Sequence, residues 1–185
     1  MSTQPDLAAP VVGTGRRRYL LIVLGVALGV VILDQLTKAW AVSVLLPRMQ
    51  PGGGGPIDVI GPWVRLTYVE NTGAAFSMGT GYTWIFTAIA AAVIVVILRL
   101  SRSLGSTAWA IALGGLLGGS VGNLLDRLTR SPAFGSGHVV DFIAFPNFPV
   151  FNVADSAITC SAVLMVLLSL RGIDYRGGAR AAARG

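Results

Sequence analysis

The sequence predicts an all-α membrane protein with four transmembrane helices. Of its 185 residues, 54% are hydrophobic and only 12% are charged, against about 25% charged residues in a typical soluble protein. Four apolar runs are also long enough to cross the roughly 30 Å hydrocarbon layer of a bilayer. The spans are expected at about residues 19–46, 82–100, 107–128 and 152–170.

The first apolar run has an alternative interpretation. It follows Arg16-Arg17-Arg18 and ends near Ala39-Trp40-Ala41, a pattern that also fits a secretory signal peptide with its cleavage site. Polar residues are too frequent near that site, and further spans follow, so we predict a first transmembrane helix. These polar residues are Asp34, Gln35, Thr37 and Lys38.

The segments between the runs are expected to be loops, with one short strand. Residues 47–62 are rich in proline and glycine, which favours a loop. Within residues 62–69, apolar side chains alternate with others at the period of two that is typical of a strand. A polar loop is expected over residues 129–151.

One membrane domain is expected over residues 16–170, between a disordered N-terminal arm at 1–15 and a basic disordered tail at 171–185. Nine of the 14 lysines and arginines lie in the arm, in the turn between the second and third spans, and in the tail. Because cytoplasmic segments carry the excess of positive charge, both termini are expected in the cytoplasm. The loops at 47–81 and 129–151 then face outward, and the net charge of +6 requires no nucleic-acid partner.

Polar side chains gather at the outer ends of the predicted spans, whereas the inner halves are almost purely apolar. Residues three or four apart share a helix face, and charged groups next to a bilayer usually mark a functional site. Four separate segments thus bring polar groups to one depth, which predicts a site at one membrane face. The residues are Asp34, Lys38, Asn123, Asp126, Arg127, Asp141, Asn152 and Asp155.

Structural roles explain some of these charges equally well. Asp34 and Lys38 have the spacing and order of a helix-stabilising ion pair. Asp126 and Arg127 could be an interfacial pair that ends the third span, although structural support for the site is the role we expect for them. His138 stands alone in a polar loop and is expected to be solvated. The single cysteine, Cys160, excludes a cysteine-based metal cluster and is expected to be a small buried core residue.

Asp141 and Asp155 flank one loop, and their pairing indicates acid–base chemistry. Asn152 is a good N-cap, and Asp155 three residues later completes a capping box. Two aspartates held close cannot both ionise easily, so one carboxylate can accept a proton from water while its protonated partner donates to a carbonyl oxygen. Asp155, at a helix N-terminus, is the expected ionised member.

Five motifs, in order along the chain, resemble those of the bacterial lipoprotein signal peptidases, the type II signal peptidases. Any one of them is weak evidence, but five in order on a four-span chain are specific. They are Asp34-Gln35-Leu36-Thr37-Lys38, Glu70-Asn71-Thr72-Gly73-Ala74-Ala75-Phe76-Ser77, Gly122-Asn123-Leu124-Leu125-Asp126-Arg127, Val140-Asp141-Phe142 and Phe151-Asn152-Val153-Ala154-Asp155-Ser156.

The resemblance implies an intramembrane aspartyl endopeptidase that removes signal peptides from diacylglyceryl-modified prolipoproteins, cutting before the lipidated cysteine. Asp141 and Asp155 would be its catalytic pair, with no metal and no cofactor. It also implies a small extracytoplasmic β-sheet between helices 1 and 2, contact with membrane lipids, and inhibition by globomycin-type antibiotics. The implied supporting residues are Asp34, Lys38, Asn71, Gly73, Asn123, Asp126, Arg127 and Asn152.

Two other classes of protein would also carry polar groups in membrane helices. A proton-coupled transporter needs carboxylates at several depths and near the midplane, whereas these gather at one face. An assembly subunit, whose polar residues only pack helices together, would tolerate Asp→Asn at both 141 and 155.

Overall fold

The computed structural model describes residues 14–73 and 83–177. In this part of the chain, four helical segments are long and apolar enough to cross a membrane, as predicted. The first is the longest: α1 (Thr14–Trp40) continues through a π-helical turn, η1 (Ala41–Leu45), into the short α2 (Leu46–Arg48). The others are α3 (Thr83–Ser101), α4 (Thr107–Thr129) and α5 (Val153–Leu170).

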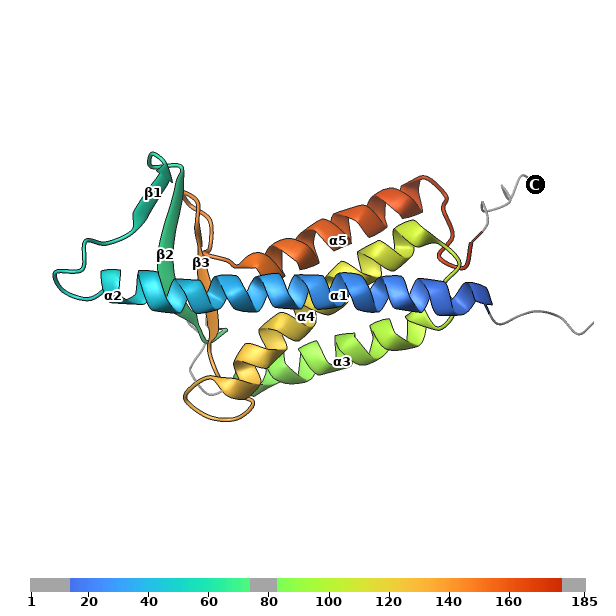
Figure 1. Cartoon of the computed structure of the whole chain (residues 1–185), viewed down its shortest axis with the longest axis horizontal. Coiled ribbons are helices and arrows are strands. Elements are labelled where there is room, and N and C mark those ends of the chain that lie inside the picture. Colours follow the sequence, from blue (N-terminus) through green and yellow to red (C-terminus); the bar gives the residue numbers. More distant parts are fainter. Residues whose placement is uncertain (1–13, 74–82, 178–185) are drawn as a thin grey trace, which may run out of the picture.

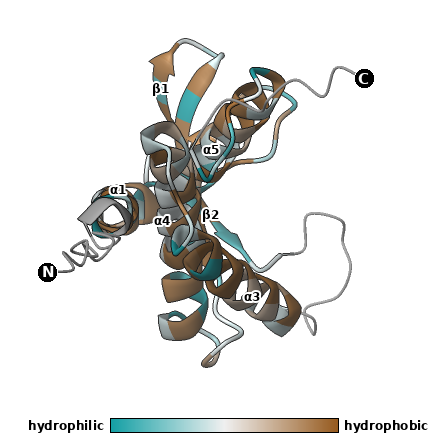
Figure 2. Cartoon of the chain, turned by 90° about the vertical axis from the view of Figure 1, so that its right-hand side faces the viewer, coloured by the Kyte–Doolittle hydropathy of each residue, from teal (hydrophilic) through white to brown (hydrophobic). Residues whose placement is uncertain are grey.

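The central helix is α4, with α1, α3 and α5 packed around it (Figure 2). A row of glycines lets the neighbours approach closely, as small residues do between membrane helices. A Cβ added at Gly118 would lie 2.7 Å from the Ala27 carbonyl oxygen of α1, and one at Gly119 would lie 2.5 Å from the Ala154 carbonyl oxygen of α5. The glycines of α4 therefore fix how closely the first and last spans approach α4.

A three-stranded antiparallel sheet closes one end of the helical bundle (Figure 1). Its strands are β1 (Ile57–Ile60), β2 (Val64–Asn71) and β3 (Val139–Ala144), in the order β1-β2-β3. The strand predicted at 62–69 is β2. The sheet packs on the end of the first span, where Val140 and Phe142 form a buried cluster with Ala41 and Leu45.

The third strand corrects the sequence-based interpretation, which placed a loop over 129–151 and a sheet only between the first two spans. β3 comes from the segment before α5. Residues 139–142 are all buried, so this strand lacks the alternating pattern by which β2 was found. Residue 57, within the expected loop at 47–62, likewise begins β1.

Some expectations fall on residues outside the described part. These are the arm at 1–13, the tail at 178–185, and residues 74–82, which include the end of the loop at 47–81, the end of the second quoted motif and the first residue of the second expected span. Residues 171–177 are described, and they fold back on the turn between α3 and α4. The Gly105 amide donates to the Tyr175 carbonyl at 2.9 Å, and the Trp109 indole donates to the Ile173 carbonyl at 2.8 Å.

Two single-residue expectations were wrong. Cys160 is exposed, because most of the apolar run of α5 lies on the surface of the helical bundle rather than in its core. His138 is not freely solvated: only 12% of its side chain is exposed, and its Nε2 lies 3.6 Å from Glu70 Oε1 at the end of β2. The strand pairing of β2 with β3 brings these two residues together, which sequence spacing does not reveal.

Candidate active site

Asp141 lies on β3 with its side chain buried, only 1% exposed. Two asparagine side chains hold its carboxylate. Asn152 donates to Oδ1 at 2.6 Å, and Asn71, from the end of the neighbouring strand β2, donates to Oδ2 at 2.8 Å. Both carboxylate oxygens therefore have a neutral donor, which orients the group without supplying a positive charge.

Asp155 lies in the first turn of α5 and closes the predicted capping box. The Asn152 side chain accepts from the Asp155 backbone N–H at 2.9 Å, and Asp155 Oδ2 accepts from the Asn152 N–H at 3.2 Å. Its other oxygen, Oδ1, accepts from Asn123 of α4 at 2.8 Å. The cap and the site are therefore one structure.

Asn152 and Asn123 join the two aspartates. The Asn152 amide nitrogen lies 3.2 Å from Asn123 Oδ1 as well as 2.6 Å from Asp141. The polar chain therefore runs from Asp141 through Asn152 and Asn123 to Asp155. A linked set of this kind fixes the relative positions of two carboxylates that would otherwise repel each other.

Beneath this chain lies a buried ion network around Lys38. Its ammonium is 2.9 Å from Asp34 Oδ2, 2.9 Å from Asp126 Oδ2 and 3.0 Å from Asn123 Oδ1, and Lys38 and Asp34 are both 0% exposed. All three ammonium hydrogens thus have partners. Because Asn123 also holds Asp155, the network supports the site directly as well as joining α1 to α4.

Asp34 and Asp126 each extend the network to another element. Asp34 Oδ1 accepts from the Ala154 backbone N–H at the start of α5, at 3.0 Å. Asp126 Oδ2 accepts from the Val140 N–H of β3 at 3.2 Å, and its Oδ1 lies 2.9 Å from Arg130 Nε. The network thus ties together the two segments that carry Asp141 and Asp155.

Arg127 does not pair with Asp126, as one interpretation of the sequence suggested. Its guanidinium lies over the Phe86 ring of α3, 5.4 Å from the centroid, and one terminal nitrogen, Nη1, is buried without a hydrogen-bond partner among the described residues. Gly73 is close by, with φ at +88°, and its amide donates to Asn71 Oδ1 at 2.8 Å. A Cβ at Gly73 would collide with Phe86, 2.6 Å away.

The two aspartates have different electrostatic surroundings. Burial raises the pKa of Asp141 from 3.8 to about 6, and the charge of Asp155 adds to the rise, although the hydrogen bonds from Asn71 and Asn152 oppose it. A carboxyl with a pKa near 6 is about half protonated at pH 6 and still about a tenth protonated at pH 7, far more than an ordinary aspartate. The pair can therefore divide into one protonated and one ionised carboxyl.

A groove of about 240 Å³ opens beside Asp141. The end of β2 and the segment before α5 form its walls. β1 pairs only with residues 64–66 of β2, so the end of β2 has a strand edge that no other strand of the sheet covers. An extended peptide could lie along such an edge. The lining residues are Val69, Glu70, Asn71, Thr72, Asp141, Pro149 and Val150.

All ten residues predicted for the site are described, and the hydrogen bonds and ion pairs above link nine of them. Arg127 makes none of these bonds; its guanidinium lies over the ring of Phe86, the same ring that a Cβ at Gly73 would meet. Sequence reasoning missed two members of the network. Gln35 donates to Asp34 at 3.1 Å and to the Gly122 carbonyl at 3.1 Å, and Arg130 pairs with Asp126. Gln35 stands inside one of the quoted motifs, which could have indicated it. Arg130 lies four residues after Asp126, so helix spacing could have indicated that pair.

Comparison with known proteins identifies the family. A family model described as signal peptidase II matches residues 26–171. The lipoprotein signal peptidase of Streptomyces coelicolor is 50% identical over 169 residues, covering 91% of this chain and 79% of the relative. That of Mycobacterium tuberculosis is 47% identical over 172 residues, covering 93% and 79%.

Solved structures agree with the sequence relatives. A bacterial membrane enzyme matches with a TM-score of 0.68 and 28% identity, over 84% of this chain and 94% of that one. A second structure of a bacterial membrane enzyme matches with a TM-score of 0.66, over 83% and 88%. The chain therefore belongs to the signal peptidase II family and is a bacterial membrane enzyme with the lipoprotein signal peptidase activity of that family.

Proposed function

We propose that this enzyme cleaves diacylglyceryl-modified prolipoproteins just before the lipidated cysteine, using Asp141 and Asp155 as its catalytic pair. The observation that carries the proposal is the shared hydrogen-bond chain: Asn152 and Asn123 hold the two carboxylates in one constellation beside a groove. Asp141 lines that groove, and no other pair of described aspartates combines linkage through two asparagines with a member that lines it.

The surroundings of the two carboxylates suggest their roles. Asp155 is the ionised member, since it receives the Asn152 N–H at the start of α5 and a second hydrogen bond from Asn123. Asp141 is the protonated member, since burial raises its pKa to about 6. General acid and general base are thereby assigned by environment, as in other aspartate pairs.

The reaction then proceeds through a gem-diol. The Asp155 carboxylate takes a proton from water as the water oxygen attacks the scissile carbonyl carbon. Asp141 gives its proton to the carbonyl oxygen, which removes the developing negative charge. On collapse, the C–N bond breaks, Asp155 passes its proton to the leaving amine nitrogen, and a gem-diol hydroxyl returns a proton to Asp141.

The supporting residues hold this pair in register. Asn71 and Asn152 orient Asp141, and Asn123 orients Asp155. Lys38 fixes Asn123 in turn, with Asp34 and Asp126 as its counter-ions. Residues locked by a second layer of contacts keep a catalytic geometry more closely than residues on free loops.

Arg127 and Gly73 face the substrate side in this proposal. The Nη1 atom of Arg127, buried and without a hydrogen-bond partner among the described residues, can donate to a backbone or lipid ester carbonyl, which would satisfy an otherwise costly buried donor. The substrate is a membrane helix with an acylated cysteine and enters sideways from the lipid. Globomycin-type inhibitors would occupy the same place.

The proposed orientation puts both termini in the cytoplasm and the sheet with its site at the extracytoplasmic face. Nine of the 14 basic residues then lie on the cytoplasmic side. The start of α1 and the end of α5 lie together at the end of the bundle opposite the sheet, which supports this topology (Figure 1).

The test is cleavage of a diacylglyceryl-modified prolipoprotein by the purified enzyme, compared with Asp141→Asn and Asp155→Asn. Each variant should fold, as judged by its thermal transition, and should lose nearly all activity. The product that the unsubstituted enzyme releases should begin with the lipidated cysteine. The matched control is Asp58→Asn, which removes an exposed ion pair with Arg65 in the sheet.

Full activity in either site variant would refute the assignment of the pair. Cleavage of the substrate without its diacylglyceryl group at an equal rate would refute the substrate class instead. Proton uptake by vesicles that disappears in both variants, without any peptide cleavage, would favour the transporter class.

A further inference from the structure

The sheet has an exposed apolar end that takes no part in the site. It consists of the β1–β2 turn and the segment that leaves β3, and we call it the apolar fringe. Ala144 pairs with Arg65, so Phe145 emerges beside the start of β2 and both parts lie at the same end of the sheet. The fringe residues and their exposed fractions are Val59 at 55%, Ile60 at 61%, Trp63 at 67%, Phe145 at 41% and Phe148 at 61%.

Aromatic contacts and backbone hydrogen bonds hold part of the fringe in place. Phe151 stacks on Phe145 with ring centroids 5.6 Å apart and meets Phe148 edge-on at 5.8 Å. Its backbone also bonds to Ile143 in both directions, at 2.8 and 3.0 Å. Contacts on this side therefore hold Phe145 and Phe148 in place while leaving much of each ring uncovered.

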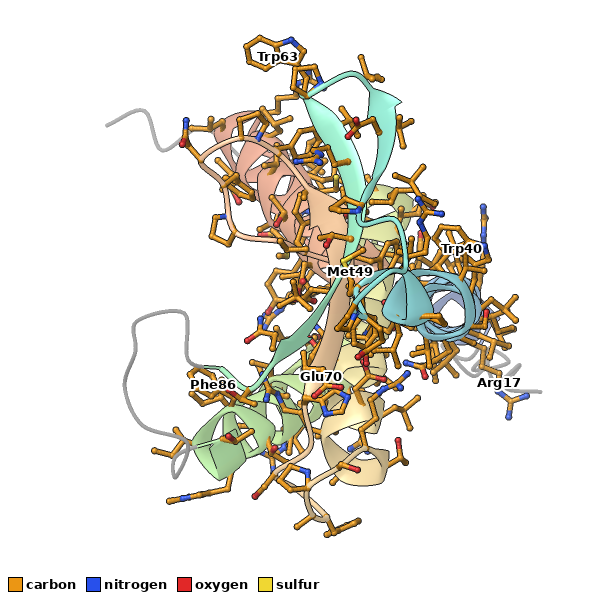
Figure 3. All side chains as sticks on the ribbon, turned by 90° about the vertical axis from the view of Figure 1, so that its left-hand side faces the viewer. Arg17, Trp40, Met49, Trp63, Glu70 and Phe86 are labelled. Carbon is orange, nitrogen blue, oxygen red and sulfur yellow. The ribbon has the colours of Figure 1, made fainter. Side chains whose placement is uncertain are left out.

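The fringe overhangs the bundle on the side of α5. Figure 3 views the molecule from the sheet end and shows Trp63 at the far tip of the β1–β2 hairpin, well beyond the helices, whereas Trp40 lies on the first helix itself. Phe148 precedes α5 by only a few residues along the chain. An exposed apolar patch that continues from a membrane-spanning surface is expected to face the same lipid.

Aromatic residues at the sheet end of the other spans point to the same partner. Trp40, 39% exposed, lies near the sheet end of α1, and Trp84, 57% exposed, lies in the first turn of α3. Tryptophan is enriched at the boundary between hydrocarbon and water. α5 has no tryptophan or tyrosine between Val153 and Leu170, yet its outward residues are apolar, with Val166 57% exposed and Leu170 79% exposed.

We infer that the apolar fringe sits in the headgroup layer of the bilayer next to α5 and supplies the interfacial aromatic anchor that α5 lacks. The nearby charges suit this position. Asp58 and Arg65, behind the tip, form a pair with Nε and Oδ1 2.7 Å apart, so the hairpin carries little net charge into the interface. The fringe would thereby hold β2 and β3, and with them the groove beside Asp141, at a fixed height above the lipid.

The test uses the single cysteine of the chain. In a Cys160→Ser background, Trp63→Cys and, separately, Phe148→Cys carry a nitroxide spin label in lipid nanodiscs. The rate at which the spin label collides with oxygen, which concentrates in lipid, is compared with the rate at which it collides with a water-soluble nickel chelate. Native Cys160, exposed within α5, is the lipid reference, and Gln50→Cys, exposed beyond the end of α2, is the water reference.

Labels at positions 63 and 148 should collide with the nickel chelate less often than the label at position 50. Their preference for oxygen over nickel should approach that of the label at Cys160. Nickel access at 63 equal to that at 50 would overturn the inference. Protection from both reagents would also overturn it, because that result indicates a protein partner such as a second copy. Ile60→Cys serves as a second hairpin position if Trp63→Cys misfolds, and the thermal transition of each variant checks its fold.

Discussion

The side-chain amide of Asn152 lies 2.6 Å from Asp141 Oδ1, while the backbone N–H of the same residue donates to Asp155 at 3.2 Å. One residue therefore caps α5, donates to one aspartate of the proposed pair and shares a reciprocal bond with the other. Helix capping and catalytic positioning are separable here, because a different atom of Asn152 performs each.

Replacing Asn152 with serine should separate the two roles. Serine is also a good N-cap, so Asn152→Ser should retain the thermal transition, but it removes the amide that donates to Asp141 and should lower kcat strongly. Asn152→Ala removes both and should lose about 1 kcal/mol of stability in addition. Steady-state cleavage and thermal unfolding in detergent measure both effects. Equal activity in the serine variant and the parent enzyme would contradict the positioning role.

Removing the positive charge of Lys38 should destabilise the protein severely. Lys38→Met leaves Asp34 and Asp126 buried and uncompensated, a change that typically costs about 3–5 kcal/mol. Adding Asp126→Asn should recover part of the loss. Asp58→Asn, at an exposed pair, should change stability by less than about 1 kcal/mol. If Lys38→Met unfolded at as high a temperature as Asp58→Asn, the ion network around Lys38 would add little to the stability of the fold.

Gly122 provides a test of the close packing between α4 and α1. An added Cβ would lie 2.5 Å from Asp34 Oδ2 and 3.1 Å from its Cγ, and Lys38 prevents that carboxylate from moving away. Gly122→Ala should therefore cost about 1–3 kcal/mol through overpacking. The matched control is Gly29→Ala on α1, which meets nothing within 4 Å and should gain up to about 1 kcal/mol from helix propensity. The two melting temperatures should move in opposite directions.

The pH dependence of the enzyme should reflect Asp141. If its protonated form is the acid, kcat/KM falls tenfold per pH unit above the pKa of Asp141, which burial raises to about 6. This carboxyl also holds its proton in the folded state at pH values where the unfolded chain, with a pKa of 3.8, has lost it. Its contribution to the unfolding free energy is therefore present below pH 3.8 and is lost as pH rises through about 6.

Infrared spectroscopy of the protonated carboxyl can follow Asp141 directly. In Asp155→Asn, the neighbouring negative charge that raises the pKa of Asp141 is absent, so the protonated band should disappear at lower pH than in the parent enzyme. Asp141→Asn identifies the band by removing it. A titration that is unchanged in Asp155→Asn would mean that the two carboxyls do not interact.

Much of this protein could be determined from the sequence alone. Apolar runs of membrane-spanning length predicted the four helices, because the bilayer imposes one length on any helix that crosses it. The capping box at Asn152 and Asp155 was also predictable, since it depends on residues three apart in one segment. The ten candidate residues followed from polar groups at one depth and from five motifs in order.

Only the tertiary structure decided which of those residues touch. Asn71 reaches Asp141 because β2 pairs with β3, and β3 itself was invisible as a strand because its first four residues are all buried and show no alternation. Lys38 pairs with Asp126 across 88 positions as well as with its helix neighbour Asp34. Local patterns determine local structure and membrane depth, whereas contacts between segments depend on how the α4 glycines let the helices pack.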